Sequence, residues 1–337
     1  MARPVLRRTF LQAAALGTGT LAMSQAQSQP QGQVPRRQLG RTGLEVSFLG
    51  LGGYHLGTIQ EQSMIDRIVN EAIDAGVNFF DNAWEYHDGR SEEVVGQALK
   101  GKRDKVIVMT KVCTHGRDQN VAMRQLEDSL RRLQTDHLDV WQIHEVVYWN
   151  DPDLIFAPNG AIEALRQAKQ QGKVRFVGFT GHKDPRIHQK MLAHDFPFDT
   201  VQMPLNCFDC TFRSFEQNIL PELNRRGIAP LGMKSFGGSG EMLRHGDVTP
   251  QEALGYAMSL PVAVTISGVD TLEVLHQNLD IARGFQPLAA SAMENLRERC
   301  RPRAADGHNE LFKMSVKYDG AVGREQHHFP PEAELPL

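Results

Sequence analysis

Short apolar runs alternate with segments of helical period along most of the chain. A helical segment shows apolar residues every three or four positions, because these then fall on one face. One such stripe, at residues 65–73, ends before Gly76, which can adopt the left-handed backbone that terminates a helix. Another is formed by Met123, Leu126, Leu130 and Leu133. The pattern predicts strands and helices in alternation.

Eight apolar runs predict eight strands, at residues 46–51, 77–81, 106–111, 138–144, 174–179, 200–203, 228–231 and 262–266. Because these runs are largely apolar throughout, both faces of the sheet are expected to be buried, as in parallel sheets. Eight strand–helix units in one chain of this length predict an α/β fold with a closed sheet, a single-domain (β/α)8 TIM barrel. Functional groups of such barrels gather at the C-terminal ends of the strands.

Polar residues end the second, third and fourth of these runs, at Asp81, Lys111 and His144, and Tyr86 follows five residues after Asp81. If the runs are neighbouring parallel strands, an acid, an ammonium, an imidazole and a phenol meet at the same open end of the barrel, its mouth. A single polar residue there could merely cap a strand end. Four in register favour a catalytic site.

Residues 78–86, Asn-Phe-Phe-Asp-Asn-Ala-Trp-Glu-Tyr, resemble the Asp-x4-Tyr motif of the aldo/keto reductases. Residues 89–96 and 108–111 are also similar to that family, and the similarity runs from about residue 37 to residue 282. The resemblance implies a barrel that reduces carbonyls with NADP(H) or NAD(H), bound extended across the strand ends. It also implies a small-molecule carbonyl substrate, an aldehyde, ketone or sugar, or the corresponding alcohol.

The chemistry explains why these four residue types belong together. Hydride addition places negative charge on the carbonyl oxygen, and Tyr86 as general acid would supply the proton. A free phenol has a pKa near 10, and we expect Lys111 beside it to lower that pKa. Asp81 is expected to keep the buried ammonium charged, and His144 to orient the carbonyl as a hydrogen-bond donor.

Cofactor contacts are expected at the ends of the later strands. By resemblance, a Ser-Asn pair after strand five and a Gln on strand six hold the nicotinamide carboxamide. Here Thr180 and Gln202 take these places, with Gly181 where the amide would stand. After strand seven, Lys234 could reach a phosphate, or it could simply be a solvated surface lysine. The remaining cofactor candidates are Leu231, Met233, Gly268, Asp270, Thr271, Gln277 and Asn278.

The preference between NADP and NAD stays open at this stage. The helix that opens after Gly268 offers free backbone N–H groups to a phosphate. The family usually carries a Lys or Arg in this stretch to read the 2′-phosphate of NADP, but Gly268 and Val274 occupy those places. Asp270 lies between them, and a carboxylate repels a phosphate.

A second signal lies at the start of the chain. Residues 6–11, Leu-Arg-Arg-Thr-Phe-Leu, form a twin-arginine core, followed by an apolar stretch at 13–23 that is too short for a stable membrane anchor. Residues 24–26 offer a cleavage site. The sequence predicts a signal peptide at 1–26, bound by the twin-arginine export machinery, and a periplasmic or extracytoplasmic location in a bacterium. The alternative is a disordered basic arm.

The expected location outside the cytoplasm conflicts with the expected cofactor, because nicotinamide cofactors are recycled in the cytoplasm. Either the cofactor is tightly held and recycled on the enzyme by a second substrate, or the protein works differently from its relatives.

Residues 27–36 are expected to form a flexible linker and 37–284 the barrel. Residues 285–337 would add one helix, near 289–299, and an irregular tail.

Composition adds limits. A formal net charge of −3 and 41% hydrophobic residues fit a soluble domain, and no basic patch suggests nucleic acid. Among the four cysteines, Cys207 and Cys210 form one C-x2-C pair, which could be a disulfide or two incidental thiols. No His or Cys spacing predicts a metal site.

Two classes of function remain. The first is an NAD(P)H-dependent carbonyl reductase or alcohol dehydrogenase. The second is a non-enzymatic nicotinamide-binding regulatory or sensor protein on the same barrel. The complete set of four favours the enzyme, because a binding module has no use for Tyr86 beside Lys111.

Overall fold

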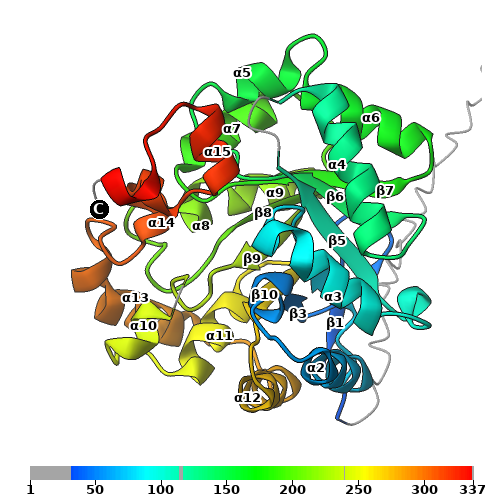
Figure 1. Ribbon diagram of the computed structural model, residues 1–337. Helices are drawn as coiled ribbons and strands as arrows, with labels where there is room; N and C mark the ends of the chain where they lie inside the picture. The colour runs from blue at the N-terminus through cyan, green and yellow to red at the C-terminus, as the bar shows by residue number, and fades with distance from the viewer. Residues whose placement is uncertain (1–31, 114–116, 239, 336–337) are drawn as a thin grey trace, which may run out of the picture. The chain divides into compact units, whose positions relative to one another are not determined.

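Eight parallel strands close into a barrel in the computed structural model, which describes residues 32–113, 117–238 and 240–335 (Figure 1). Each strand pairs with its neighbours in chain order, and the last pairs with the first to close the ring. The strands are β3 (Leu49–Gly52), β4 (Phe79–Asp81), β5 (Ile107–Val112), β6 (Leu138–Ile143), β7 (Val174–Thr180), β8 (Thr200–Pro204), β9 (Ala229–Met233) and β10 (Val264–Gly268). This confirms the predicted (β/α)8 barrel.

Helices on the outside of the barrel connect successive strands, because a parallel connection must cross back over the sheet (Figure 1). The longer ones are α2 (Gln62–Asp74), α3 (Arg90–Ala98), α4 (Gln119–Arg132), α6 (Ala161–Gln170), α7 (Pro185–Ala193), α9 (Leu220–Arg226), α11 (Pro250–Ser259) and α12 (Leu272–Arg283). Short pieces are α1 (Gly53–Leu56), η1 (Tyr86–Gly89), η2 (Arg103–Lys105), α5 (Asp151–Phe156), α8 (Phe215–Asn218) and α10 (Glu241–Arg244). The predicted stripe on α2 is buried, and the helix stops before Gly76, whose φ is +95°.

A small antiparallel hairpin precedes the barrel, formed by β1 (Arg36–Gln38) and β2 (Glu45–Ser47). The single strand expected at 46–51 is therefore wrong, because its first residues belong to the hairpin. The break falls after Ser47, whose N–H donates to Asn78 Oδ1 at 2.7 Å and whose hydroxyl donates to Leu49 O at 2.6 Å. Local hydrogen bonding replaces the ladder at this point.

The expected linker at 27–36 is also wrong in its last part. Val34 is buried and its N–H donates to Ala75 O at 2.8 Å, while Arg36 already belongs to β1. The rest of the expected linker and the predicted signal peptide at 1–26 lie outside the described residues.

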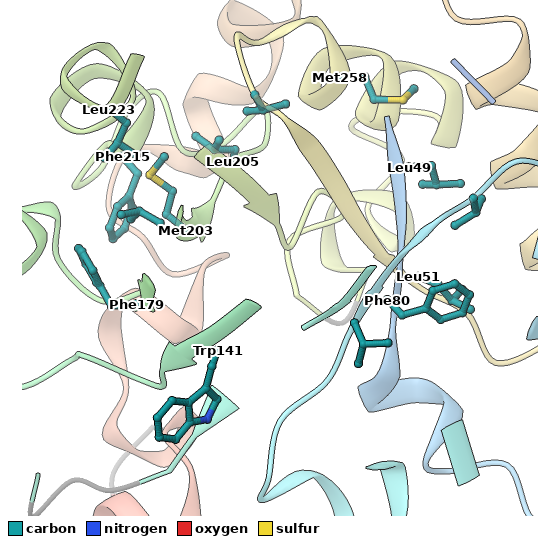
Figure 2. Packing of buried hydrophobic residues seen from close by; sticks show 14 of the residues in the cluster. Leu49, Leu51, Phe80, Trp141, Phe179, Met203, Leu205, Phe215, Leu223 and Met258 are labelled. Carbon is teal, nitrogen blue, oxygen red and sulfur yellow. The ribbon is translucent and has the colours of Figure 1, made fainter. Parts of the chain in front are cut away.

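Two hydrophobic layers form the core, because alternate residues of a strand face opposite sides of the sheet. Phe79 faces the barrel interior, together with Met109 and Val140. Its neighbour Phe80 belongs to the larger layer between strands and helices, and Figure 2 shows it beside Leu51 of the same layer. The buried runs therefore hold the strand ends, and the polar residues on them, in fixed register.

The C-terminal segment is more ordered than expected. It forms α13 (Ala290–Ala304), α14 (Leu311–Met314), η3 (Val316–Tyr318), α15 (Ala321–Gln326) and η4 (Glu332–Glu334). Figure 1 draws α14 and α15 near α8 and α7, and α13 near α10 and α11. Lys313 fixes α14 there: its ammonium lies 2.7 Å from Asp209 Oδ1 and 2.8 Å from Glu310 Oε2, with all three side chains fully buried. The helix expected near 289–299 is present as α13, but the irregular tail expected after it is wrong, because helices as short as those that follow show no readable period.

The four cysteines are unpaired thiols. The Cys207 thiol hydrogen-bonds the Cys300 thiol of α13, whereas Cys210 Sγ contacts Cys207 O at 3.4 Å. The hydrogen-bonding partner of the Cys207 thiol is therefore Cys300 on the helix α13, and not the other cysteine of the C-x2-C pair. In the described part of the chain, the helices are all too short or too polar to span a bilayer.

Candidate active site

The structure brings the four predicted residues together at the C-terminal end of the barrel. Asp81 ends β4, Lys111 lies near the end of β5, His144 follows β6, and Tyr86 begins η1. Lys111 Nζ donates to Asp81 Oδ1 at 2.5 Å and lies 3.5 Å from the Tyr86 hydroxyl. The rings of Tyr86 and His144 meet edge to face, with centroids 5.7 Å apart.

Lys111 and Asp81 form a buried ion pair, with side chains 1% and 6% exposed. Burial lowers the pKa of the Lys111 ammonium, and Asp81 opposes that shift, as the sequence predicts. A second hydrogen bond, from Lys111 Nζ to Asn82 O at 2.7 Å, also holds the ammonium. The pair is therefore fixed in place and carries little net charge.

Tyr86 departs from the expectation. Loss of hydration raises the pKa of its phenol well above the ordinary value, and the carboxylates of Asp81, Glu85 and Glu145 raise it further. The expected lowering by Lys111 is wrong for the protein without cofactor. The physical reason is that burial of the phenol, the largest cause, and the Asp81 carboxylate are not offset by Lys111, whose ammonium is already paired with Asp81.

Glu85 is a functional candidate that the sequence analysis missed. Its Oε1 lies 2.6 Å from His144 Nδ1, although the ring N–H does not point along that line, and its Oε2 accepts the thiol hydrogen of Cys113 at 2.7 Å. Burial raises the pKa of the Cys113 thiol well above its ordinary value, and Glu85 adds to the shift. The signal available in the sequence was its place directly before Tyr86.

Glu145, directly after His144, is a second missed carboxylate. Its backbone is left-handed, with φ +46°, a conformation that costs energy for a residue other than glycine. Arg117 compensates by donating to His144 O and Glu145 O, both at 3.0 Å, and by an ion pair of 3.1 Å with Asp151. The turn after β6 is thus held so that His144 and Glu145 face one mouth.

Part of that mouth is closed by the C-terminal segment. The N–H of Gly320 donates to Glu145 Oε2 at 2.9 Å. The neighbouring Asp319 is buried and receives Lys183 Nζ at 2.6 Å and the Tyr148 hydroxyl at 3.0 Å. A segment without readable period in the sequence therefore borders the site.

Donor atoms of Glu85, His144 and Glu145 all lie within 4.8 Å of one another. Two carboxylates and an imidazole at this separation are a set that a divalent cation can use. The absence of a metal therefore stays a prediction from the sequence.

A cleft of about 290 Å³ opens beside Tyr86. Gln202 lines the cleft and donates from Nε2 to Asp81 Oδ2 at 3.1 Å, while its buried Oε1 has no hydrogen-bond partner among the described residues. An unpaired amide oxygen suits a carboxamide N–H₂ group. The lining residues are Gly52, Gly53, Tyr54, His55, Asp81, Tyr86, Gln202, Met233, Lys234, Ser235, Phe236, Gly238, Gly240, Leu243, Ile266, Ser267 and Gly268.

The predicted cofactor residues divide into two groups. Gln202, Met233, Lys234 and Gly268 line the cleft. Thr180 is buried at the end of β7, and a side chain at Gly181 would come within 2.4 Å of Val146 O, so packing excludes the family's amide there.

The other candidates do not line the cleft. Leu231 lies in the barrel core, and Asn278 is buried with its Nδ2 donating to Ser267 Oγ at 3.2 Å. The Thr271 hydroxyl caps α12 by accepting the Val274 N–H. Asp270 and Gln277 are exposed. Tyr54 and His55 were missed, because their run after β3 carries no motif.

The chain matches the model of the aldo/keto reductase family over residues 48–242, more than half of its length. The chain belongs to this family, whose members are oxidoreductases. It is 32% identical over 205 residues to the aldo-keto reductase YhdN of Bacillus subtilis (strain 168), covering 56% of this chain and 58% of the relative. It is 34% identical over 217 residues to an L-galactose dehydrogenase of Arabidopsis thaliana, covering 60% of this chain and 66% of that relative.

Solved structures support the fold. The aldo-keto reductase AKR11C1 from Bacillus halodurans, in a holo form, has a TM-score of 0.68 and 24% sequence identity, with 82% of this chain and 99% of that chain covered. The chain spans less than two thirds of the length of the curated relatives named above.

Proposed function

We propose that this aldo/keto reductase transfers hydride between NAD(P)H and the carbonyl of an aldehyde, ketone or sugar, with Tyr86 as general acid. The observation that carries this proposal is the Tyr86 hydroxyl, 3.5 Å from Lys111 Nζ, in a cleft that is also lined by Gln202, whose Oε1 has no hydrogen-bond partner in the described part of the chain. A general acid, a charge partner and an open cleft are the parts that carbonyl reduction needs.

The cleft fits a nicotinamide cofactor. Gln202 Oε1 suits the carboxamide, and Lys234 is a cation placed to meet a phosphate. Glycines at 52, 53 and 268 line the cleft without side chains. The cofactor, when bound, supplies the hydride. The choice between NADP and NAD remains open, because the exposed Asp270 would repel a 2′-phosphate.

The raised pKa of Tyr86 has a defined consequence. The phenol keeps its proton throughout the physiological range, so the acid form is always available. Loss of this proton is unfavourable, because the phenolate that forms then lies near carboxylates. Lys111 Nζ beside the hydroxyl is the group that stabilises the phenolate at that moment.

Names of relatives favour a sugar among the carbonyl classes. The L-galactose dehydrogenase is 34% identical, and a 6-dehydroglucose reductase of Novosphingobium aromaticivorans is 27% identical over 219 residues. Carboxylates at the mouth, from Glu85 and Glu145, can accept hydrogen bonds from hydroxyl groups. We therefore place sugars first in the substrate panel.

Export by the twin-arginine pathway is part of the proposal, on the strength of the sequence at 1–26. This pathway carries folded proteins, which allows a cofactor to be bound before export. A mass spectrum of small molecules released from protein purified after export would show whether a cofactor travels with the chain.

The test is a fluorescence titration of the protein with NADPH and NADH, followed by turnover of aldoses, simple aldehydes and ketones. The proposed contact of the cofactor is tested by Gln202→Leu, which removes the amide oxygen and should weaken binding of both cofactors about tenfold or more. Tight binding without turnover of any carbonyl would favour the regulatory or sensor alternative.

A further inference from the structure

A lysine in the cleft carries a charge that no carboxylate neutralises. Lys234 follows β9 directly and lines the cleft together with Tyr86 and Gln202. Its side chain is partly buried, and its ammonium forms no ion pair or hydrogen bond with any residue that the structure describes. Because a partly buried charge is stabilised by a partner of opposite sign, this ammonium is suited to bind an anion that enters the cleft.

Two aromatic rings of the C-terminal segment lie next to this ammonium. Lys234 Nζ is 5.4 Å from the ring centroid of Phe312 and 5.3 Å from that of Tyr318. The two rings meet edge to face, with centroids 5.8 Å apart. The negative face of an aromatic ring attracts a cation. Unlike a carboxylate, however, a ring holds the cation without neutralising its charge.

The backbone of Lys234 is held by the same segment. Its φ is +57°, a left-handed conformation that costs energy for a residue other than glycine. The Lys234 carbonyl accepts the N–H of Gly237 at 2.9 Å and Nδ2 of Asn206 at 3.2 Å. Asn206 Nδ2 also lies 3.4 Å from Oε1 of the buried Glu310, directly before α14. The tail therefore contacts the lysine at its ammonium and supports it at its backbone.

Gly238 shows how closely the tail approaches the cleft. Its φ is +92°, and a Cβ at this position would lie 2.7 Å from the Tyr318 hydroxyl. Gly238 also lines the cleft. The ring of Tyr318 therefore reaches the cleft wall beside Lys234.

We propose that Phe312 and Tyr318 are positioning residues of the cofactor site, whose rings hold the Lys234 ammonium where it binds a phosphate group of the nicotinamide cofactor. This inference rests on the proposed function and deepens it, because it makes the C-terminal segment part of cofactor binding. Lys234 differs here from Lys111, whose charge is paired with Asp81. The charge of Lys234 stays available to a phosphate.

Removal of one ring should weaken cofactor binding. Tyr318→Leu should raise the Kd of NADPH or NADH, whichever binds more tightly, about three- to tenfold in a fluorescence titration. Tyr318→Phe keeps the ring and should restore the wild-type Kd. The matched control is Phe329→Leu, because Phe329 belongs to the same tail but stacks on Tyr148 instead. It should leave the Kd unchanged.

A double-mutant cycle shows whether Tyr318 acts through the lysine. Lys234→Met keeps most of the apolar stem, removes the charge, and should raise the Kd about tenfold or more. Tyr318→Leu added to Lys234→Met should then cause no further loss, because the ring has no ammonium left to hold. Losses that simply add would overturn the inference.

The contact is also read without any cofactor, from the ¹³C-methyl spectrum of the full chain after reductive dimethylation of its lysines, which keeps their positive charge. The Lys234 signal is identified by its loss in Lys234→Met. Ring currents should shift it upfield in the wild type and in Tyr318→Phe, and less so in Tyr318→Leu. Inorganic pyrophosphate should move this signal, with a Kd about three- to tenfold higher in Tyr318→Leu.

An unshifted Lys234 signal in the wild type would overturn the inference. So would a Kd in Tyr318→Leu that equals the wild-type value or falls below it, since tighter binding means that the rings draw the ammonium away from the cleft. Turnover of a carbonyl without coupling between Tyr318 and Lys234 leaves the proposed function standing and ends the inference. If neither cofactor binds, the proposed function fails, and the pyrophosphate titration alone decides whether the rings position Lys234 for a phosphate.

Discussion

Tyr86 separates two regions of the strand-end face that differ in their electrostatics. On one side, Lys111 and Asp81 form an ion pair of 2.5 Å that is almost fully buried. On the other, Glu85 and Glu145 bring two carboxylates to His144. The pKa of the phenol is raised, first by its burial and then by the carboxylates of both regions. A lysine whose charge is already paired with a carboxylate thus does not offset the effect of burial on the pKa of the neighbouring phenol.

The largest expected effect on stability comes from removing only the lysine of the buried ion pair. Lys111→Met leaves Asp81 buried without its cation, and we expect the free energy of unfolding to fall by about 3–5 kcal/mol. Urea unfolding measures this loss. The double variant Asp81→Asn/Lys111→Met removes both charges and should recover much of it. Equal losses in the single and double variants would mean that the pair is not electrostatically coupled.

A smaller effect is expected where the tail meets the carboxylate side. A Cβ at Gly320 would lie 2.8 Å from Glu145 Oε2 and 3.0 Å from Glu85 Oε2. Gly320→Val should therefore push the segment away, at a cost of about 1–3 kcal/mol. We expect a higher KM with a smaller change in kcat, and faster hydrogen exchange in residues 310–335. Ala321→Val, at the exposed neighbouring position, is the matched control. Unchanged exchange in Gly320→Val would show that this contact does not hold the segment.

A stability effect of similar size concerns the buried anchor of that tail. Burial raises the pKa of Glu310 from an ordinary value near 4.5 to about 7, against the pull of Lys313. Between these values the folded chain holds a proton that the unfolded chain has lost. Stability from this group is therefore present at low pH and declines as pH rises through that window.

We expect this decline to be about 1–3 kcal/mol between the two values, followed as the free energy of unfolding against pH. Glu310→Gln should flatten it, whereas Glu325→Gln, on the exposed part of the tail, should not. A wild-type curve that rises through the window would contradict the assignment.

The barrel and its four central residues could be predicted because the signal is local. Buried parallel strands are continuous apolar runs, and Asp81, Lys111 and His144 stand at or beside their ends in the sequence and in space. The first strand was misread because two elements, separated at Ser47, share one apolar run. Pattern alone does not show where a ladder changes partners.

The rest depended on contacts that no local pattern encodes. Glu85 and Glu145 adjoin predicted residues, but which way their side chains turn is decided by Cys113, Arg117 and the tail. The tail has helices too short for a period, and one buried lysine, Lys313, holds it to Asp209 over about a hundred residues of chain. The raised pKa of Tyr86 follows first from the burial of its phenol, which no local pattern shows, and then from the carboxylates around it.

Turnover of Tyr86→Phe tests the central claim most directly, measured with whichever carbonyl the wild type reduces fastest. Removing only the hydroxyl should lower kcat by about two to four powers of ten, because the proton donor is lost. Cofactor affinity, read by fluorescence titration, should stay near the wild-type value, since Gln202 and Lys234 are untouched. Wild-type turnover in Tyr86→Phe would show that another group delivers the proton and that the phenol is not the acid.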